Sequence, residues 1–163
     1  MTDPAAPRVL VRAADRAALQ EQSFRHPLNP HSEIHGYMLS RLCGLSRAGV
    51  NLIRIPPGKE SYAFHAHLAD EEWMYVLSGQ GTLEVGDEAL PVGPGDFAGF
   101  VAGGKAHNLR NTGHEDRVYL SGGEHHELEV ADFPRHGKRA IRTAHGLTLY
   151  PLSAGEPLGQ GSG

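Results

Sequence analysis

The sequence contains a single cysteine, Cys43, so no disulfide can form within the chain. Disulfides are rare in a reducing cytoplasm, and a lone thiol agrees with that compartment. The first residues, MTDPAAPRVL, lack the apolar core of a secretory signal peptide, and no apolar run approaches the length of a membrane span. We therefore expect a cytoplasmic protein with no membrane partner.

An excess of positive charge is also missing. The chain has 15 lysines and arginines against 19 acidic residues, which gives a formal net charge of −4. Nucleic acids and anionic membranes attract basic surfaces, so this balance argues against both. The first 36 residues are also too short and too rich in proline for a helix-turn-helix. We expect a small molecule, and no nucleic acid, as the partner.

Long amphipathic helices are absent as well. From Tyr37 onward, short segments with alternating or continuous apolar residues are separated by turns that contain glycine or proline. The expected strands cover residues 37–42, 49–55, 61–67, 72–78, 82–86, 88–92, 96–101, 106–111 and 117–123. Gly86-Asp87 predicts a hairpin turn between two of them. Short strands without intervening helices indicate an all-β sandwich or barrel.

A chain of 163 residues is expected to form one domain. Residues 1–36 are predicted to be a lead-in, with a short helix over 13–22 and a proline-interrupted loop over 24–36. The barrel is expected over 37–125. Residues 126–163 then form a C-terminal extension that wraps around the barrel and ends in a flexible tail.

Eleven histidines are an unusual number, and three of them are placed to converge with a glutamate. His65 and His67 alternate along a strand and so share one face. Glu72 follows after a turn-length stretch and begins the neighbouring strand. His107 begins a later strand, after a glycine-rich corner. We predict that these four side chains face one point inside the barrel.

Three imidazoles and one carboxylate suit a divalent transition metal ion such as Fe, Mn, Ni or Zn better than Mg or Ca, which prefer oxygen ligands. The set leaves room in the coordination shell, as a catalytic metal requires. The alternative is a barrel of the same kind that holds no metal.

Two segments resemble the motifs of the cupin superfamily. GKESYAFHAHLADEEWMYVLSG resembles the first motif through Gly58, His65, His67, Glu72 and Gly79, with one extra residue after the first glycine. GDFAGFVAGGKAHNLRN resembles the second motif through Gly95, His107 and Asn111, with Val101 in the usual place of a proline. The resemblance covers residues 48–123, and EVADFPRHGKR is similar to a subgroup of small bacterial single-domain cupins without a settled common function.

This resemblance implies a double-stranded β-helix, or jelly roll, that often forms a homodimer. It also implies a metal set of His65, His67, Glu72 and His107. Glu71 is the neighbouring alternative, but only Glu72 matches the motif distance to Gly79. Asp70 and Glu71 are then expected to be solvent-exposed turn residues.

The remaining candidates are weaker. Five histidines are expected to be exposed: His114, His125, His126, His136 and His145. Of three in the lead-in, one could cover the barrel mouth: His26, His31 or His35. Along 72–78, alternation directs Met74 and Val76 inward and Trp73 and Tyr75 outward. Asn111 is interpreted as structural, and Tyr119 and Arg54 are candidate substrate contacts.

These features predict a metal-dependent enzyme that acts on a small, oxygen-rich metabolite, with sugar or sugar-phosphate isomerisation as the leading reaction. An Fe(II) dioxygenase acting on a catechol-like or diketone substrate is an alternative. A non-catalytic barrel that binds a small molecule is another. No catalytic residue is assigned from the sequence.

Overall fold

The computed structural model describes residues 8–16 and 18–156. Its helical elements are α1 (Ala13–Arg16), α2 (Leu39–Leu42), η1 (Pro134–His136) and η2 (Leu152–Ala154). Its strands are β1 (Gln22–Phe24), β2 (Ile34–Tyr37), β3 (Ala48–Ile55), β4 (Ala66–His67), β5 (Glu72–Ser78), β6 (Gly81–Val85), β7 (Glu88–Val92), β8 (Phe97–Phe100), β9 (His107–Arg110), β10 (Arg117–Glu124), β11 (Glu129–Phe133), β12 (Lys138–Thr143) and β13 (Gly146–Pro151). None of the helices in these ranges has the length and apolarity that crossing a membrane takes.

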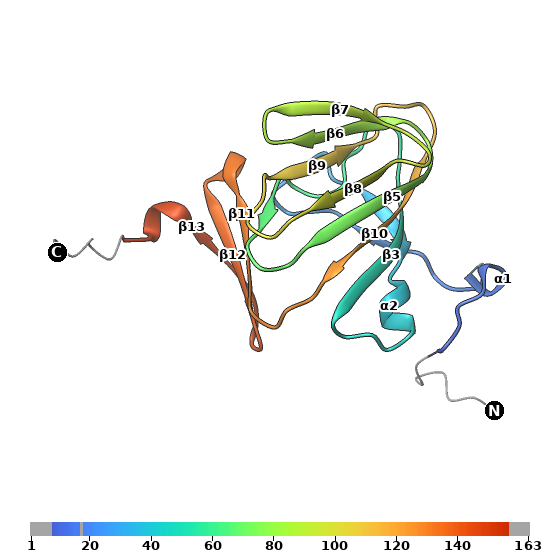
Figure 1. The fold of residues 1–163 in the computed structure, drawn as a ribbon, viewed down its shortest axis with the longest axis horizontal. Coiled ribbons are helices and arrows are strands. Elements are labelled where there is room, and N and C mark those ends of the chain that lie inside the picture. The colour runs from blue at the N-terminus through green and yellow to red at the C-terminus, as the bar shows by residue number, and fades with distance from the viewer. Residues whose placement is uncertain (1–7, 17, 157–163) are drawn as a thin grey trace.

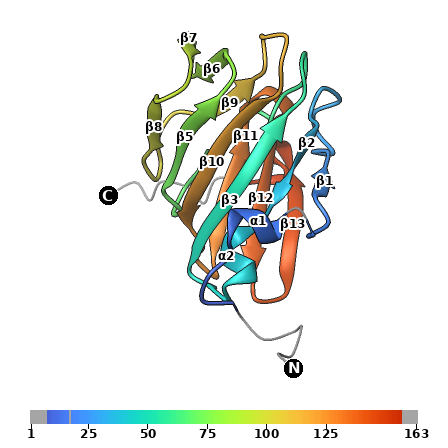
Figure 2. The ribbon, with the colours of Figure 1, turned by 90° about the vertical axis from the view of Figure 1, so that its right-hand side faces the viewer.

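The strands build two layers (Figures 1 and 2). One layer is a six-stranded sheet in the order β1-β2-β3-β10-β5-β8. The other contains the sheets β7-β6-β9 and β13-β12-β11-β4. An antiparallel bridge between His65 and His107 joins these two smaller sheets. The arrangement confirms the predicted all-β jelly roll.

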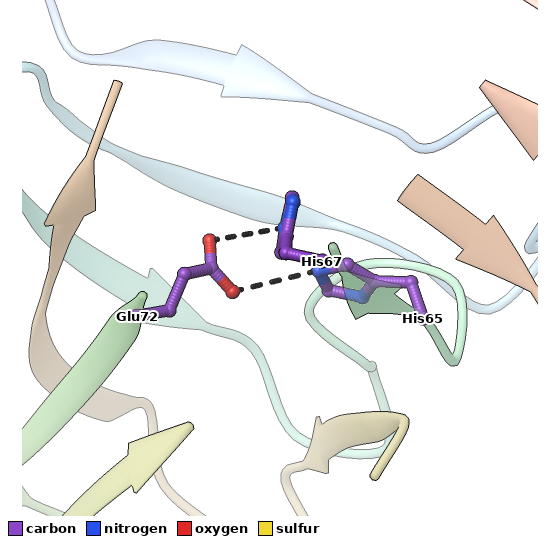
Figure 3. A group of neighbouring side chains, drawn as sticks. All are labelled: His65, His67 and Glu72. Carbon is purple, nitrogen blue, oxygen red and sulfur yellow. Dashed lines mark ion pairs between the residues drawn. The ribbon is translucent and has the colours of Figure 1, made fainter. Parts of the chain in front are cut away.

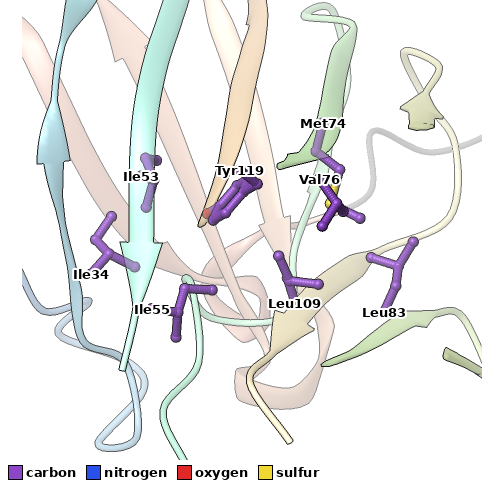
Figure 4. Packing of buried hydrophobic residues seen from close by; sticks show 8 residues of the cluster. All are labelled: Ile34, Ile53, Ile55, Met74, Val76, Leu83, Leu109 and Tyr119. Carbon is purple, nitrogen blue, oxygen red and sulfur yellow. The ribbon is translucent and has the colours of Figure 1, made fainter. Parts of the chain in front are cut away.

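The hydrophobic core lies between the layers. Its buried members come from both layers: Ile34, Ile53, Ile55, Met74, Val76, Leu83, Leu109 and Tyr119 (Figure 4). Burying each large aliphatic side chain contributes roughly 1.5–3 kcal/mol. Along β5, Met74 and Val76 are buried while Tyr75 is 40% exposed, as the alternation predicts. This core lies beside the candidate site, and none of the four predicted metal ligands belongs to it.

Four local predictions are wrong. The strand expected over 61–67 is only the two-residue β4, preceded by an isolated bridge at His65. The other three lie at the N-terminal side. The helix expected over 13–22 is only the single turn α1, because Gln22–Phe24 instead pairs with β2. The loop expected over 24–36 accordingly ends in a strand. The strand expected over 37–42 contains helix α2, in which Cys43 N–H donates to the Leu39 carbonyl at 3.2 Å. Leucines three residues apart fit one helical turn as well as they fit a strand.

The C-terminal extension is more regular than predicted. β11 pairs with β4 through Ala131 and His67, and β12 and β13 continue the same sheet outward. The extension thus forms part of the second layer and supplies residues to the candidate site. The division into residues 1–36, 37–125 and 126–163 stays a prediction, and the last seven residues of the expected tail lie outside the described ranges.

Candidate metal centre

The four predicted ligands sit where strands begin or end. His67 lies on β4, His65 is two residues earlier, and Glu72 and His107 are the first residues of β5 and β9. The bridge between His65 and His107 fixes their backbones, with N–H to carbonyl distances of 3.1 and 2.8 Å. Backbone pairing therefore brings His65 and His107 together although 42 positions separate them in the sequence.

Three imidazoles face one carboxylate. The Nε2 atoms of His65, His67 and His107 lie 3.6, 3.4 and 3.2 Å from the nearest Glu72 oxygen. Figure 3 shows the two pairs that Glu72 makes with His65 and His67. The ligand atoms of these three residues all lie within 4.8 Å of one another, whereas His107 joins them through its contacts with Glu72 and the His65 ring. Adjacent ligand atoms that are each about 2.1 Å from one metal ion lie roughly 3.0–3.4 Å apart, close to the observed distances.

In two of the histidines, the partner of Nδ1 determines that this nitrogen carries a proton. His65 Nδ1 donates to the Ala63 carbonyl at 2.8 Å, and a carbonyl can only accept. His67 Nδ1 lies 3.3 Å from the Glu129 carboxylate. With Nδ1 protonated in both rings, each Nε2 faces Glu72 either as the second N–H donor of an imidazolium or as a lone pair with a cation between the ring and the carboxylate. Outer partners of this kind are typical of metal-binding histidines, so the donor set fits a metal ion.

His107 is held by packing. Its ring stacks on Phe100, with centroids 3.6 Å apart and an angle of 4° between the planes. Its Nδ1 is buried and has no hydrogen-bond partner in the described part of the chain. Stacking therefore orients the ring, and its Nε2 points at Glu72.

The charges of the cluster favour the metal-binding forms of Glu72 and His107. Burial acts to raise the pKa of Glu72, but hydrogen bonds from His107, His65 and His67 outweigh it and hold that pKa well below its usual value. Burial lowers the pKa of His107. For His67, burial also works against the charged form, but Glu72 and Glu129 raise its pKa overall. Glu72 is thus an anion, and the site has a negative centre surrounded by imidazoles.

A cavity of about 380 Å³ opens beside the cluster. Its walls are largely aromatic and aliphatic, from both layers. Tyr62 and Tyr119 line it, and burial raises the pKa of Tyr62 to about 12 and that of Tyr119 well above its usual value. Burial, together with His65 and His136, lowers the pKa of His26 to about 4, so the His26 ring in the cavity wall is neutral at pH 7.

Comparison with known proteins identifies the family. Residues 51–127 match the sequence profile of the cupin domain. The structure of a candidate sugar phosphate isomerase from Acidithiobacillus ferrooxidans is 35% identical and superimposes with a TM-score of 0.88, over 93% of this chain and 97% of that one. The chain belongs to the cupin superfamily.

Two further proteins are similar to this cupin. A sugar phosphate isomerase of the cupin superfamily from Silicibacter pomeroyi is 28% identical, with a TM-score of 0.75 over 85% of this chain and 89% of that one. The oxalate-binding protein of Thermotoga maritima is 32% identical over 69 residues, which is 42% of this chain. The matched stretch spans 55% of that relative's length. The predicted family membership is confirmed.

The weaker predictions have mixed outcomes in this cupin. Tyr119 lines the cavity, but Arg54 does not, because Glu21 and Asp116 hold its guanidinium at 2.7 and 3.0 Å. His26 is the lead-in histidine that reaches the cavity. Asn111 is structural as predicted, since its amide donates to the Ile55 and Glu115 carbonyls at 2.7 and 2.8 Å.

Several exposure predictions are settled as well. The five histidines expected to be exposed are so, although His126 also contacts Asp70 and His125 borders the cavity. Trp73 stacks on Phe97, yet it also borders the cavity, which the alternation did not predict. Glu71 is exposed, as expected.

The prediction for Asp70 is wrong, and its two buried or half-buried partners, Arg142 and Glu129, were not predicted from the sequence. Asp70 was expected in solvent, but its side chain is only 4% exposed and pairs with Arg142 at 2.5 Å. Glu129, 3% exposed, accepts backbone N–H groups of the loop from His67 to Glu72. Both partners come from the C-terminal extension, about sixty to seventy residues away, where no spacing pattern pointed to the site.

Proposed function

We propose that this cupin holds one divalent transition metal ion, Fe, Mn, Ni or Zn, with His65, His67, Glu72 and His107. The supporting observation is that three imidazole nitrogens aim at one carboxylate while outer partners fix the Nδ1 atoms of His65 and His67. When bound, such an ion polarises substrate oxygens and stabilises the negative charge that develops on them.

We further propose that the protein is an enzyme acting on a small, oxygen-rich metabolite, and that it isomerises a sugar or a sugar derivative. Two similar structures carry the name of sugar phosphate isomerase, one of them provisionally, and the first match spans 93% of this chain. A cavity of about 380 Å³ has the size of a small-metabolite site. The convergence of the four ligand side chains beside that cavity carries the proposal.

The chain itself would position the substrate. Tyr62 and Tyr119 keep their protons at neutral pH, so each hydroxyl is a hydrogen-bond donor for a substrate oxygen. His26 accepts the Leu28 N–H at Nδ1, at 3.2 Å, which leaves its proton on Nε2 as a further donor. The apolar walls exclude water and strengthen these contacts.

Deuterium exchange tests the reaction. Isomerisation of an aldose to a ketose through an enediolate removes the proton at C2, so NMR in D2O should show deuterium at C2 of the aldose or C1 of the ketose with the metal-loaded protein. Glu72→Ala should abolish exchange, and Glu71→Ala, at the exposed neighbour, should retain it. No deuterium exchange and no ketose formed from aldoses, aldose phosphates and uronates, whichever of the four metals is loaded, would contradict the isomerase proposal. Oxygen uptake by the iron form with catechols or diketones would favour the dioxygenase.

A non-catalytic binding protein is the second candidate. The similarity to the oxalate-binding protein of Thermotoga maritima favours it. Binding of oxalate to the metal-loaded protein, with no turnover of any sugar, would support this alternative. A homodimer and a cytoplasmic location stay predictions, and light scattering on the purified chain tests the first.

A further inference from the structure

One arginine lies in the wall of the cavity beside the candidate metal ligands. Arg142, on β12, is the only lysine or arginine that lines the cavity within the described ranges. Its Nη2 donates to Asp70 Oδ2 at 2.5 Å and its Nε donates to the His126 carbonyl at 3.0 Å. No acceptor in the described part of the chain takes Nη1. Two fixed contacts therefore orient the guanidinium while one edge stays available.

Asp70 ties this arginine to the metal cluster. Its Oδ1 accepts the His126 backbone N–H at 2.9 Å and lies 2.8 Å from His126 Nδ1. A carboxylate oxygen of Asp70 lies within 4.8 Å of a His67 ring nitrogen. The guanidinium of Arg142 is thus linked to the candidate ligand His67 through the single carboxylate of Asp70. A molecule in the cavity can reach both.

The local charge limits which anion fits. Asp70 already balances the charge of Arg142, and Glu124 and Glu129 also line the cavity. A phosphate dianion would meet these carboxylates with no further lysine or arginine to offset its second charge. A carboxylate carries a single charge and can accept N–H groups of a guanidinium in its plane.

We propose that Arg142 forms a carboxylate-binding subsite, and that the substrate is a polyhydroxy carboxylate. This inference rests on the proposed function. Adjacent oxygens at one end of the substrate face the metal ligands, and the carboxylate at the other end meets Arg142. The inference narrows the sugar derivative to an acid and disfavours a phosphorylated sugar.

Three hexoses that differ only at C6 test the subsite. Calorimetry on the full chain loaded with Zn²⁺, which has no redox chemistry, compares D-glucose, D-glucuronate and D-glucose 6-phosphate. We expect glucuronate to bind about tenfold or more tightly than glucose, as a charge-assisted hydrogen bond provides. Glucose 6-phosphate should bind no more tightly than glucose.

The variants assign this preference to one side chain. Arg142→Gln should bind glucuronate and glucose equally, and Arg142→Lys should keep part of the difference. Arg139→Gln is the matched control, because Arg139 lies on the same strand and forms a similar pair with Asp132, at 2.6 and 2.8 Å, but does not line the cavity. If Arg142→Gln unfolds because Asp70 is left unpaired, the double variant Asp70→Asn/Arg142→Gln removes both charges and answers the same question.

Three outcomes would overturn the subsite: a glucuronate preference that survives in Arg142→Gln, tighter binding of glucose 6-phosphate than of glucuronate, or no binding of any hexose to fully loaded protein. A protein that takes up none of Fe, Mn, Ni and Zn would instead refute the metal proposal. In that case the same titrations on the metal-free chain still decide the subsite, since glucuronate binding either requires Arg142 or the inference is wrong.

Discussion

Replacing Glu129 by glutamine tests whether this buried carboxylate holds the loop between His67 and Glu72. Its Oε2 accepts the backbone N–H groups of Asp70 and Ala69 at 2.7 and 3.1 Å. Its Oε1 accepts the Leu68 N–H at 2.9 Å and lies 3.3 Å from His67 Nδ1. Glutamine has the same size, but it places an NH2 group where one of these oxygens stood.

Whichever way the amide turns, at least one backbone N–H loses its acceptor and faces another donor. A hydrogen bond to a charged group contributes about 1.5–3 kcal/mol, and a buried donor without a partner costs about 1–3 kcal/mol. We expect the variant to lose roughly 2–4 kcal/mol of stability. In a chain of this size that lowers Tm by about 5–15 °C.

The same change should weaken metal binding. An NH2 group beside His67 Nδ1 favours the tautomer with the proton on Nε2, which then cannot bind a metal. Loss of an outer partner of a metal-binding histidine typically costs about 10–100-fold in affinity. Circular dichroism melts of the metal-free protein and Zn²⁺ titrations measure the two effects separately. Glu127→Gln, at an exposed position two residues away, is the control. If Glu129→Gln has the same Tm and the same zinc affinity as Glu127→Gln, the reasoning is refuted.

Three further predictions concern the site, the core and the surface. His65→Ala and Glu72→Ala should each lose most bound metal yet stay folded, because none of the four ligands belongs to the hydrophobic core. A metal-free protein already unfolded at room temperature in a circular dichroism melt would contradict this. Leu109→Ala, at a 3% exposed core position, should cost about 2–5 kcal/mol in urea unfolding, while Leu90→Ala, at 43% exposure, should cost little; equal costs would contradict the assigned core. A hydrogen bond from Arg54 lowers the pKa of Glu21 below 4.5. The wild type should therefore be more stable than Glu21→Gln above pH 4.5, and this difference in the free energy of unfolding should shrink as the pH drops through the lowered pKa. That difference is at most about 1 kcal/mol for a partly exposed pair, and an NMR titration midpoint at or above the usual value would disprove it.

Seven of the nine predicted barrel strands, all but 37–42 and 61–67, were predictable because their signal is local. Within β5, residues 74–77 alternate between buried and exposed positions, and Gly86 supplies the positive φ of 58° that the predicted hairpin turn needs. Segments whose structure depends on a distant partner were not predictable. Gln22–Phe24 becomes a strand only because Ile34–Tyr37 lies beside it, and β11–β13 form a sheet only because β11 pairs with β4.

The candidate site divides in the same way. His65 and His67 share a face by alternation, and a turn of fixed length brings Glu72 beside them, so the sequence pattern predicted their convergence. The supporting contacts of Glu129 and Arg142 span 59 to 72 residues. Nothing in the order of residues says that the extension folds back onto this loop. Asp70 was misplaced for that reason, since its burial depends on Arg142 and His126.

Metal content is the most direct test of the central claim, that His65, His67, Glu72 and His107 hold one metal ion. Elemental analysis would be made on protein purified without a histidine tag, on His107→Ala and on His114→Ala, whose exposed histidine is the control. We predict one equivalent of Fe, Mn, Ni or Zn per chain in the wild type and in His114→Ala, and most of it lost in His107→Ala. A wild-type protein that contains no metal, and takes up none when each of the four ions is added, would contradict the account.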